Sequence, residues 1–307
     1  MVNYKAADTL ISRDKLLDKE NYRTYAETRE VFSLPCIGLC NDKSLQLEIA
    51  PGDFLYIPME FVSESFNMGD GKGIEAIKCV GRDIEFIFRI EGDKVVPSRL
   101  DAMVEAKKRL MKYQVGTVIY GRVVSLAPFG AFVDIGSGTI GLLPIRLQAV
   151  GHTAPTAQRF DVGDEIPVVL YAKDRGRFTL TTIPVLGTFD QNIEALKEYS
   201  TVIGVVRSVK DYGAFIEITP NLVGLSGEEG ICYKPGDKVS VCIRNIRPEK
   251  SKLRLIVIDK VPSYTPPTIP YQWHTPQGNM LSYWQYNTND PNDKLTFDFE
   301  GGVMYGL

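Results

Sequence analysis

Four aromatic side chains occupy matching places in two segments of this chain. Phe129 and Phe132 lie three residues apart around a Gly-Ala pair, and Tyr212 and Phe215 repeat the arrangement. Glycine lets a strand bend and lets another group approach its backbone closely, so rings at such a bend can face solvent. Each nucleic-acid base that stacks on an exposed ring contributes about 1–3 kcal/mol, with little regard to sequence. The pattern predicts a surface that stacks unpaired bases.

Positively charged residues accompany the rings. Arg177 and Lys252 recur at the same place in both segments, directly before an apolar run that would form a closing strand. A cation there can contact the phosphate of a nucleotide whose base stacks on the rings. Further cations that could line the same groove are Arg122, Arg207, Lys210 and Arg254.

The charge of the chain is modest and unevenly distributed. The net charge of -3 argues against a protein that coats nucleic acid by charge alone. Residues 115–183 carry 6 basic and 5 acidic side chains, and residues 199–260 carry 10 and 7. The positive excess coincides with the ring-bearing segments, as expected for a binder that relies on stacking as much as on phosphate neutralisation.

Catalytic and metal-binding patterns are missing from the sequence. It contains no Walker loop, nucleophile elbow, paired metal carboxylates or Cys/His triad. Cys36 and Cys40 are closely spaced, but zinc takes four ligands and the two histidines, His152 and His274, lie far away in sequence. We therefore expect a protein that is not an enzyme and that carries no metal or other cofactor.

The rings belong to a repeated unit, because residues 121–142 match residues 204–225 without a gap, 83 positions later. Apolar and polar residues alternate in five short runs of each copy, as in strands with one buried face. The first copy predicts strands at 117–124, 130–135, 141–144, 166–172 and 178–182. The second predicts strands at 201–209, 213–219, 224–226, 239–246 and 253–257. Five such strands over about 65 residues are typical of the OB-fold, a small Greek-key barrel.

The motifs of both copies resemble a known family. The order is G-x-V-x-x-G-x-V, an aromatic before Gly-Ala-Phe, then Gly-Leu, Gly-Asp and a closing R-x-x-L. This resembles the RNA-binding repeat of bacterial ribosomal protein S1, over 115–183 and 199–258. The resemblance implies an OB barrel that binds single-stranded RNA, with the basic position of the family on Arg177 and Lys252. A histidine that often follows Gly-Leu in the family is replaced by Pro144 and Gly227.

The remaining chain predicts further elements around these copies. Residues 31–100 resemble a degenerate third copy that lacks the aromatic-Gly-x-Phe motif; the alternative is a different small β domain. A helix is expected at 101–113 and another at 190–199. The predicted order is a helical segment (1–30), a degenerate barrel (31–100), a linker helix (101–114), a barrel (115–183), a linker helix (184–198), a barrel (199–260) and a Pro- and aromatic-rich tail (261–307). The tail should run extended over 262–276 and then form a hairpin from 280–287 and 295–300.

The sequence thus predicts an all-β chain of three tandem five-stranded OB barrels joined by short helices. We expect it to bind single-stranded, mRNA-like RNA in translation or RNA metabolism, with the ribosome or RNA-processing proteins as candidate partners. Neither end has an apolar run long enough for a membrane span or signal-peptide core, so a cytoplasmic protein without a membrane partner is expected. The alternative is a protein–protein scaffold in which the aromatic tail forms part of the interface.

Overall fold

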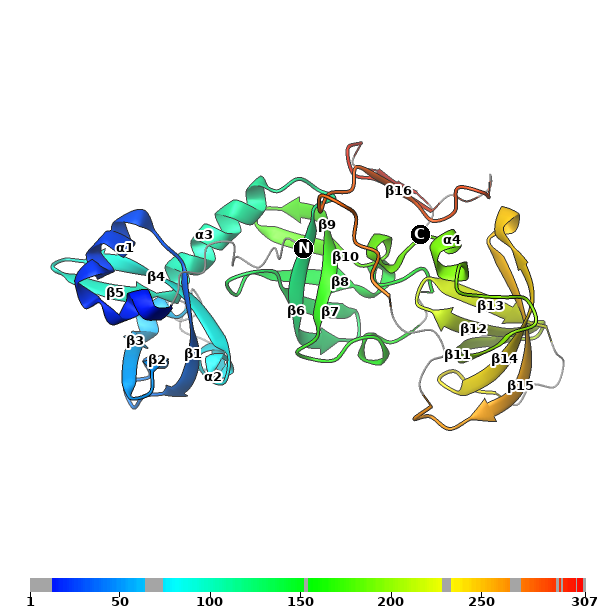
Figure 1. The fold of residues 1–307 in the computed structure, drawn as a ribbon, viewed down its shortest axis with the longest axis horizontal. Helices are drawn as coiled ribbons and strands as arrows, with labels where there is room; N and C mark the ends of the chain where they lie inside the picture. Colours follow the sequence, from blue (N-terminus) through cyan, green and yellow to red (C-terminus); the bar gives the residue numbers. More distant parts are fainter. Residues whose placement is uncertain are drawn as a thin grey trace. The chain divides into compact units, whose positions relative to one another are not determined.

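The structure is a computed structural model that describes residues 13–63, 74–151, 154–227, 233–265, 272–290, 293, 295–301 and 303–305. It is mostly β, with three five-stranded barrels, short helices and a small C-terminal sheet (Figure 1). This confirms the predicted fold class. The chain divides into two compact units, Met1–Tyr113 with Asp134–Ile140, and Gln114–Val133 with Gly141–Leu307. Each is described by itself.

The first unit contains barrel 1, whose strands run in the order β3-β2-β1-β4-β5, with the edge strands β3 and β5 in contact. The strands are β1 (Phe32–Leu39), β2 (Leu45–Ala50), β3 (Asp53–Ile57), β4 (Asp83–Glu91) and β5 (Lys94–Ser98). Short helices accompany them: η2 (Arg13–Leu17), η3 (Lys19–Asn21), α1 (Tyr22–Thr28), η4 (Met59–Phe61) and α2 (Ile74–Cys79). The barrel is nearly closed, and its β1–β2 turn carries Asp42 and Ser44 in place of an aromatic pair.

Helix α3 (Arg99–Lys112) follows barrel 1 and confirms the expected linker helix. It begins two residues before the predicted start, because the Ser98 hydroxyl accepts a hydrogen bond from Asp101 N (3.0 Å) and caps the first turn. The predicted N-terminal helix is seen only in part. From residue 13 onward it consists of short 3-10 turns and α1, and residues 1–12 lie outside the described residues.

The second unit contains two closed barrels of the same topology. Barrel 2 consists of β6 (Val118–Ala127), β7 (Gly130–Asp134), β8 (Ile140–Pro144), β9 (Glu165–Asp174) and β10 (Arg177–Thr181). Barrel 3 consists of β11 (Thr201–Lys210), β12 (Gly213–Thr219), β13 (Leu222–Ser226), β14 (Lys238–Arg247) and β15 (Lys252–Val261). Both close through a parallel pair, β8 with β10 and β13 with β15. The predicted five-stranded barrels are therefore confirmed.

Short helical segments connect these strands. Within barrel 2 they are η6 (Ile145–Leu147) and η7 (Thr156–Gln158), and η9 (Pro248–Lys250) lies between β14 and β15. The expected linker helix between the barrels is shorter and earlier than 190–199. It consists of η8 (Pro184–Leu186) and α4 (Phe189–Ile193), where Thr188 and Gln191 form a capping box that fixes the helix start.

The C-terminal tail forms a sheet that packs against both barrels of its unit. Its strands β16 (Tyr283–Gln285), β17 (Thr296–Asp298) and β18 (Val303–Tyr305) are antiparallel, so the predicted hairpin is confirmed and gains a third strand. Trp284, Tyr286, Phe297 and Phe299 are buried in one core cluster with side chains of barrels 2 and 3. One hydrophobic cluster therefore joins the sheet, barrel 3 and the adjoining part of barrel 2.

Candidate nucleic-acid interface

The two predicted ring pairs have nearly the same geometry. Phe129 and Phe132 meet edge to face, with ring centroids 6.0 Å apart and an interplanar angle of 88°. Tyr212 and Phe215 do the same at 6.1 Å and 87°. Phe129 is 58% exposed and Tyr212 64%, whereas Phe132 and Phe215 are half-buried beneath them. In barrels 2 and 3 alike, an exposed ring thus packs edge to face on a half-buried one.

The glycine before each Ala-Phe pair is required by the protein's own backbone. A Cβ on Gly130 would lie 2.5 Å from Leu143 O, at the end of β8. Gly213 has a φ of 141° and equally lacks room, because Ser226 O at the end of β13 takes the space of a Cβ. We expected these glycines to admit a ligand; in the structure, the neighbouring strand occupies the space. The close packing bends the chain so that the preceding ring points outward.

Arg254 lies on the same outer face as the rings of barrel 3. Phe215 pairs with Leu225, and Leu225 pairs with Arg254, so the three residues form a row across β12, β13 and β15. A Cβ on Gly227 would lie 4.0 Å from Arg254 Nη1 and 3.9 Å from Tyr212 O. The guanidinium is therefore close to the Tyr212 end of the ring pair, beside the position of the missing family histidine.

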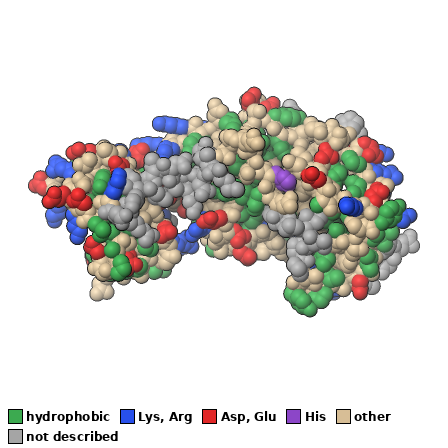
Figure 2. Space-filling view, viewed as in Figure 1, with side chains coloured by type: hydrophobic (Ala, Val, Ile, Leu, Met, Phe, Trp, Pro, Cys, Tyr) green, Lys and Arg blue, Asp and Glu red, His purple; other side chains and the backbone are tan. Residues whose placement is uncertain are grey.

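Three more of the predicted cations are exposed at strand ends. Arg177 begins β10 and Lys252 begins β15, at matching register positions in the two barrels. Lys210 ends β11 and pairs with Gly213, directly beside the Tyr212–Phe215 pair. Both acidic and basic side chains are spread over the face of the molecule in Figure 2, in agreement with the modest net charge.

The last two predicted cations are engaged by carboxylates. Arg122 makes an exposed ion pair with Glu165 at 2.8 Å. Arg207 donates from Nε (3.0 Å) and Nη2 (2.9 Å) to the two oxygens of Glu217, and only 8% of its side chain is exposed. Arg207 therefore has a structural partner in the interior, and we leave it out of the interface proposed below.

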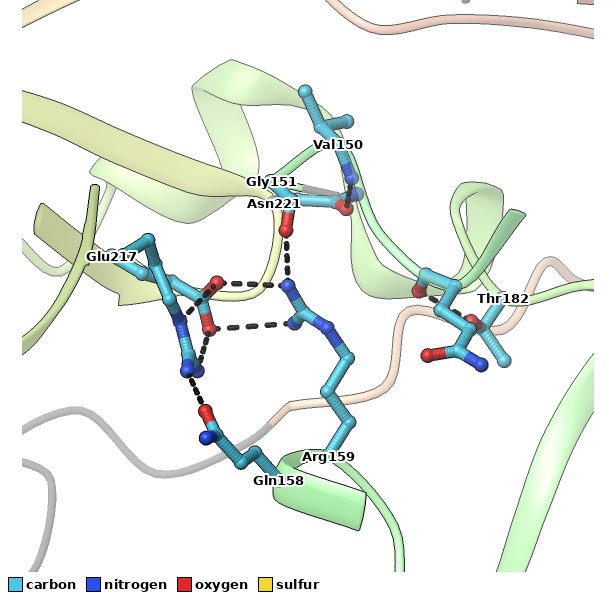
Figure 3. A network of polar contacts seen from close by, with 9 residues as sticks. Val150, Gly151, Gln158, Arg159, Thr182, Glu217 and Asn221 are labelled. Carbon is cyan, nitrogen blue, oxygen red and sulfur yellow. Dashed lines mark hydrogen bonds and ion pairs between the residues drawn. The ribbon is translucent and has the colours of Figure 1, made fainter. Parts of the chain in front are cut away.

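Glu217 is the centre of a buried polar network that sequence reasoning missed (Figure 3). Arg159, from the segment after η7 of barrel 2, donates to the same carboxylate from Nη1 (3.3 Å) and Nη2 (2.9 Å). Arg159 also donates to Gly151 O, and Arg207 donates from Nη1 to Gln158 Oε1 (2.6 Å). One carboxylate of barrel 3 thus binds two guanidinium groups, one from each barrel.

Asn221 makes a second connection between the barrels. Its Nδ2 donates to Ile183 O and Gly187 O, both at 2.8 Å, and its Oδ1 accepts from Val150 N at 3.0 Å. Its backbone oxygen accepts from the Tyr286 hydroxyl of the tail at 2.6 Å. The residue is fully buried with every side-chain polar group bonded, so it fixes the β12–β13 turn of barrel 3 against barrel 2 and the tail.

The tail contacts bear on the scaffold alternative. Tyr286 meets Phe189 and Phe297 meets Tyr171 in edge-to-face contacts at 5.9 and 6.1 Å. Because these tail rings are buried inside their own unit, they are not presented to a protein partner in this conformation.

Among the described residues, no group of His, Cys, Asp and Glu could hold a metal ion, and no helix is long and apolar enough to cross a membrane.

Comparison with known proteins identifies the repeat. Residues 112–181 match the family model of the S1 RNA binding domain. The small ribosomal subunit protein bS1 of Leuconostoc lactis is 33% identical over 217 residues, 65% of this chain and 50% of that protein. The bS1 of Staphylococcus aureus strain N315 is 30% identical over 230 residues, 68% of this chain and 57% of that protein. The chain spans about half the length of these curated relatives.

One solved structure is similar to this chain at a lower sequence identity. It is a multidomain protein with nucleic acid binding domains from Streptococcus pneumoniae, 13% identical, with a TM-score of 0.25, and the match covers 75% of this chain and 73% of that one. The family match and the bS1 relatives are stronger, and they agree with the barrels described above. The chain contains an S1 RNA-binding domain and is a distant homologue of ribosomal protein bS1.

Proposed function

We propose that this protein binds single-stranded RNA without catalysing a reaction, by stacking bases on the exposed rings of barrels 2 and 3. The observation that carries the proposal is the pair of matching edge-to-face ring contacts, Phe129–Phe132 and Tyr212–Phe215. A single aromatic ring that is more than half exposed is common at a protein surface and does not by itself indicate a function. Its repetition with the same geometry on two barrels supports a role in binding.

Single strands suit this surface better than duplexes. A duplex hides the faces of its bases, whereas an unpaired base can splay out and stack on Phe129 or Tyr212. The phosphates beside such bases would contact the cations that lie near the rings. In barrel 3 Lys210 and Arg254 lie beside the rings, and Lys252 lies two residues before Arg254 on the same strand. In barrel 2 the position that matches Lys252 is Arg177. Arg122 joins them only if its exposed pair with Glu165 opens.

Barrel 1 has a different part in the proposal. Its β1–β2 turn presents Asp42 and Ser44 where the other barrels present rings, so it offers neither stacking nor charge for RNA at that place. We assign it a scaffolding role. The relatives are ribosomal proteins, and a role in translation or RNA metabolism, with the ribosome or RNA-processing proteins as partners, is proposed on that basis.

A titration of the whole chain with an unstructured RNA at two salt concentrations tests this function. Fluorescence anisotropy of an end-labelled RNA should show binding that weakens as salt rises, with a slope of about 0.7 per phosphate contacted. A duplex of the same sequence should bind more weakly. Absence of salt-dependent binding to the single strand would contradict the proposal and favour the scaffold alternative.

A further inference from the structure

Tyr199 is an exposed aromatic residue in an unusual backbone conformation, just before β11. Its side chain is 68% exposed, and its φ of 64° lies in the left-handed region that disfavours any residue with a Cβ. The guanidinium carbon of Arg244, on β14, lies over its ring at 5.8 Å from the centroid. Strain of this kind persists where the surrounding structure imposes it, and it is concentrated at functional sites.

Barrel 2 has the same backbone site with different side chains. Tyr199 N donates to Ile243 O (2.7 Å) and Ile243 N to Ser200 O (2.9 Å); in barrel 2, Gly116 N donates to Leu170 O and Leu170 N to Thr117 O, both at 2.8 Å. A bulge follows at the same place in both barrels, next to Leu170 and Ile243. Tyr199 and Arg244 therefore correspond to Gly116 and Tyr171. Gly116 also has a positive φ, 94°, as this site demands.

The surface of barrel 2 at this site is covered by the chain's own tail. Leu281 N donates to Gly116 O (3.0 Å), and Leu281 O leaves no room for a Cβ on Gly116. The ring of Phe297 meets the ring of Tyr171 edge to face, with centroids 6.1 Å apart. In barrel 2 the site is thus covered by an aromatic ring of the tail, Phe297. In barrel 3 it carries the exposed ring of Tyr199.

The two sites also differ in charge. Around the barrel 3 site, the outer face of β14 and β15 carries four cations: Arg244, Arg247, Lys252 and Arg254. The register pairs Arg247 with Lys252 and Asn245 with Arg254. The corresponding residues of barrel 2 are Tyr171, Asp174, Arg177 and Thr179, with no net charge. The covered site is neutral, whereas the open one stays positive even when Glu198, whose carboxylate accepts a hydrogen bond from Ile246 N (3.0 Å), is counted with the four cations.

We infer that Tyr199 and Arg244 form a second base-stacking subsite for single-stranded RNA on barrel 3, and this inference rests on the proposed function. An aromatic platform surrounded by cations fits a flat base with its phosphates better than an apolar protein segment. The subsite is continuous with the first one. Phe215, Leu225, Arg254 and Asn245 follow one another across four strands, and Arg244 is next to Asn245.

The strand positions define a path for the RNA. At about 4.8 Å between neighbouring strands, three steps separate Phe215 from Asn245 by roughly 14 Å of surface. An RNA bound at Tyr212 would cross Arg254, which can contact its backbone, and reach Tyr199 with a later base. Nucleic acids of about 4 to 16 nucleotides occupy single OB-folds, so a longer RNA engages both subsites and a very short one engages a single subsite.

The test is Tyr199→Gly, which places in barrel 3 the residue that barrel 2 has at this site. Because glycine relieves the left-handed strain, the variant should fold at least as well as wild type by circular dichroism and thermal unfolding. Its affinity for an unstructured RNA of about twelve nucleotides should fall roughly tenfold, since a stacked base is lost. Tyr199→Phe should retain the affinity, and Tyr264→Gly, which removes a tyrosine that is 86% exposed elsewhere, should leave it unchanged.

The outcomes separate this inference from the proposed function. If Tyr199→Gly binds RNA as tightly as wild type while Tyr212→Ala binds weakly, the second subsite is wrong and RNA binding stands. If wild type fails to bind RNA, both are wrong. If a synthetic peptide of residues 280–300 binds at Tyr199 and RNA affinity is unchanged in the glycine variant, the site belongs to a protein segment. Loss of RNA affinity in the glycine variant, with the fold intact, supports the inference.

Discussion

Glu217 and Arg159 form a two-pronged ion pair in which both side chains are almost completely buried, 6% and 2% exposed. Arg159 belongs to barrel 2 and Glu217 to β12 of barrel 3, and Arg207 of β11 shares the same carboxylate. Two cations and one anion are thus removed from water together. Both cations depend on the one carboxylate, because its loss would leave two buried charges unpaired, which is very unfavourable.

Replacing Glu217 should therefore destabilise the second unit strongly. Glu217→Gln leaves two buried guanidinium groups without a carboxylate, and we expect the free energy of unfolding to fall by about 3–5 kcal/mol. Urea unfolding followed by tryptophan fluorescence measures it, since Trp284 lies in the shared core. Glu165→Gln is the matched control, because its pair with Arg122 is exposed and should contribute only ~0.2–1 kcal/mol. Equal losses in the two variants would contradict the role assigned to Glu217.

Removal of the barrel 2 ring pair should weaken RNA binding without unfolding the protein. Phe129→Ala combined with Phe132→Ala deletes a stacking platform, with an expected loss of roughly 1–3 kcal/mol for each base unstacked. Anisotropy titration measures the affinity, and circular dichroism checks the fold. Val162→Ala, at an exposed apolar residue of the same barrel, should change neither. Wild-type affinity in the double variant would mean that these rings serve another purpose.

The strand-end cations should contribute charge alone. Arg177→Ala combined with Lys252→Ala should lower affinity for all RNA sequences alike. It should also reduce the salt dependence by one to two units of slope, at about 0.7 for each phosphate contact of a single strand. The measurement is affinity across a salt series for wild type and the double variant. Equal slopes would remove both residues from the interface.

Alkaline pH should weaken the contact between the tail and the barrels. Burial, with the charge of Asp293 as a smaller cause, raises the pKa of Tyr286 above its ordinary value of 10.0. The folded protein then holds the phenol proton more tightly than the unfolded chain does. This stabilisation is complete below pH ~10 and is lost as pH rises further.

Tyr286→Phe separates this titration from that of other groups. The variant loses the hydrogen bond to Asn221 O, about 1 kcal/mol at neutral pH. Urea unfolding between roughly pH 8 and pH 11 should then show a steeper loss of stability in wild type than in the variant. Parallel pH profiles would show that Tyr286 is not the group responsible.

The sequence by itself determined the barrels and the ring pairs. Strand alternation, glycine at the bends and an ungapped repeat are local signals, so they place Ala131 and Ala214 inside and Phe129 and Tyr212 outside in each copy alike. The same period of two puts Glu217 on the outer face of β12 with Phe215, where a carboxylate is normally solvated.

Only the tertiary structure decided what covers those outer faces. Barrel 2 buries Glu217 by bringing Arg159 onto it, 58 residues away in sequence, and this also takes Arg207 into the interior. The tail covers Gly116 and Tyr171 and leaves Tyr199 and Arg244 open. The alternation of apolar and polar residues along a strand indicates which face of the strand a side chain lies on. The packing of one barrel or segment on another depends on residues that are distant in sequence. Whether each charged or aromatic side chain of an outer face is buried or exposed therefore depends on the folded chain.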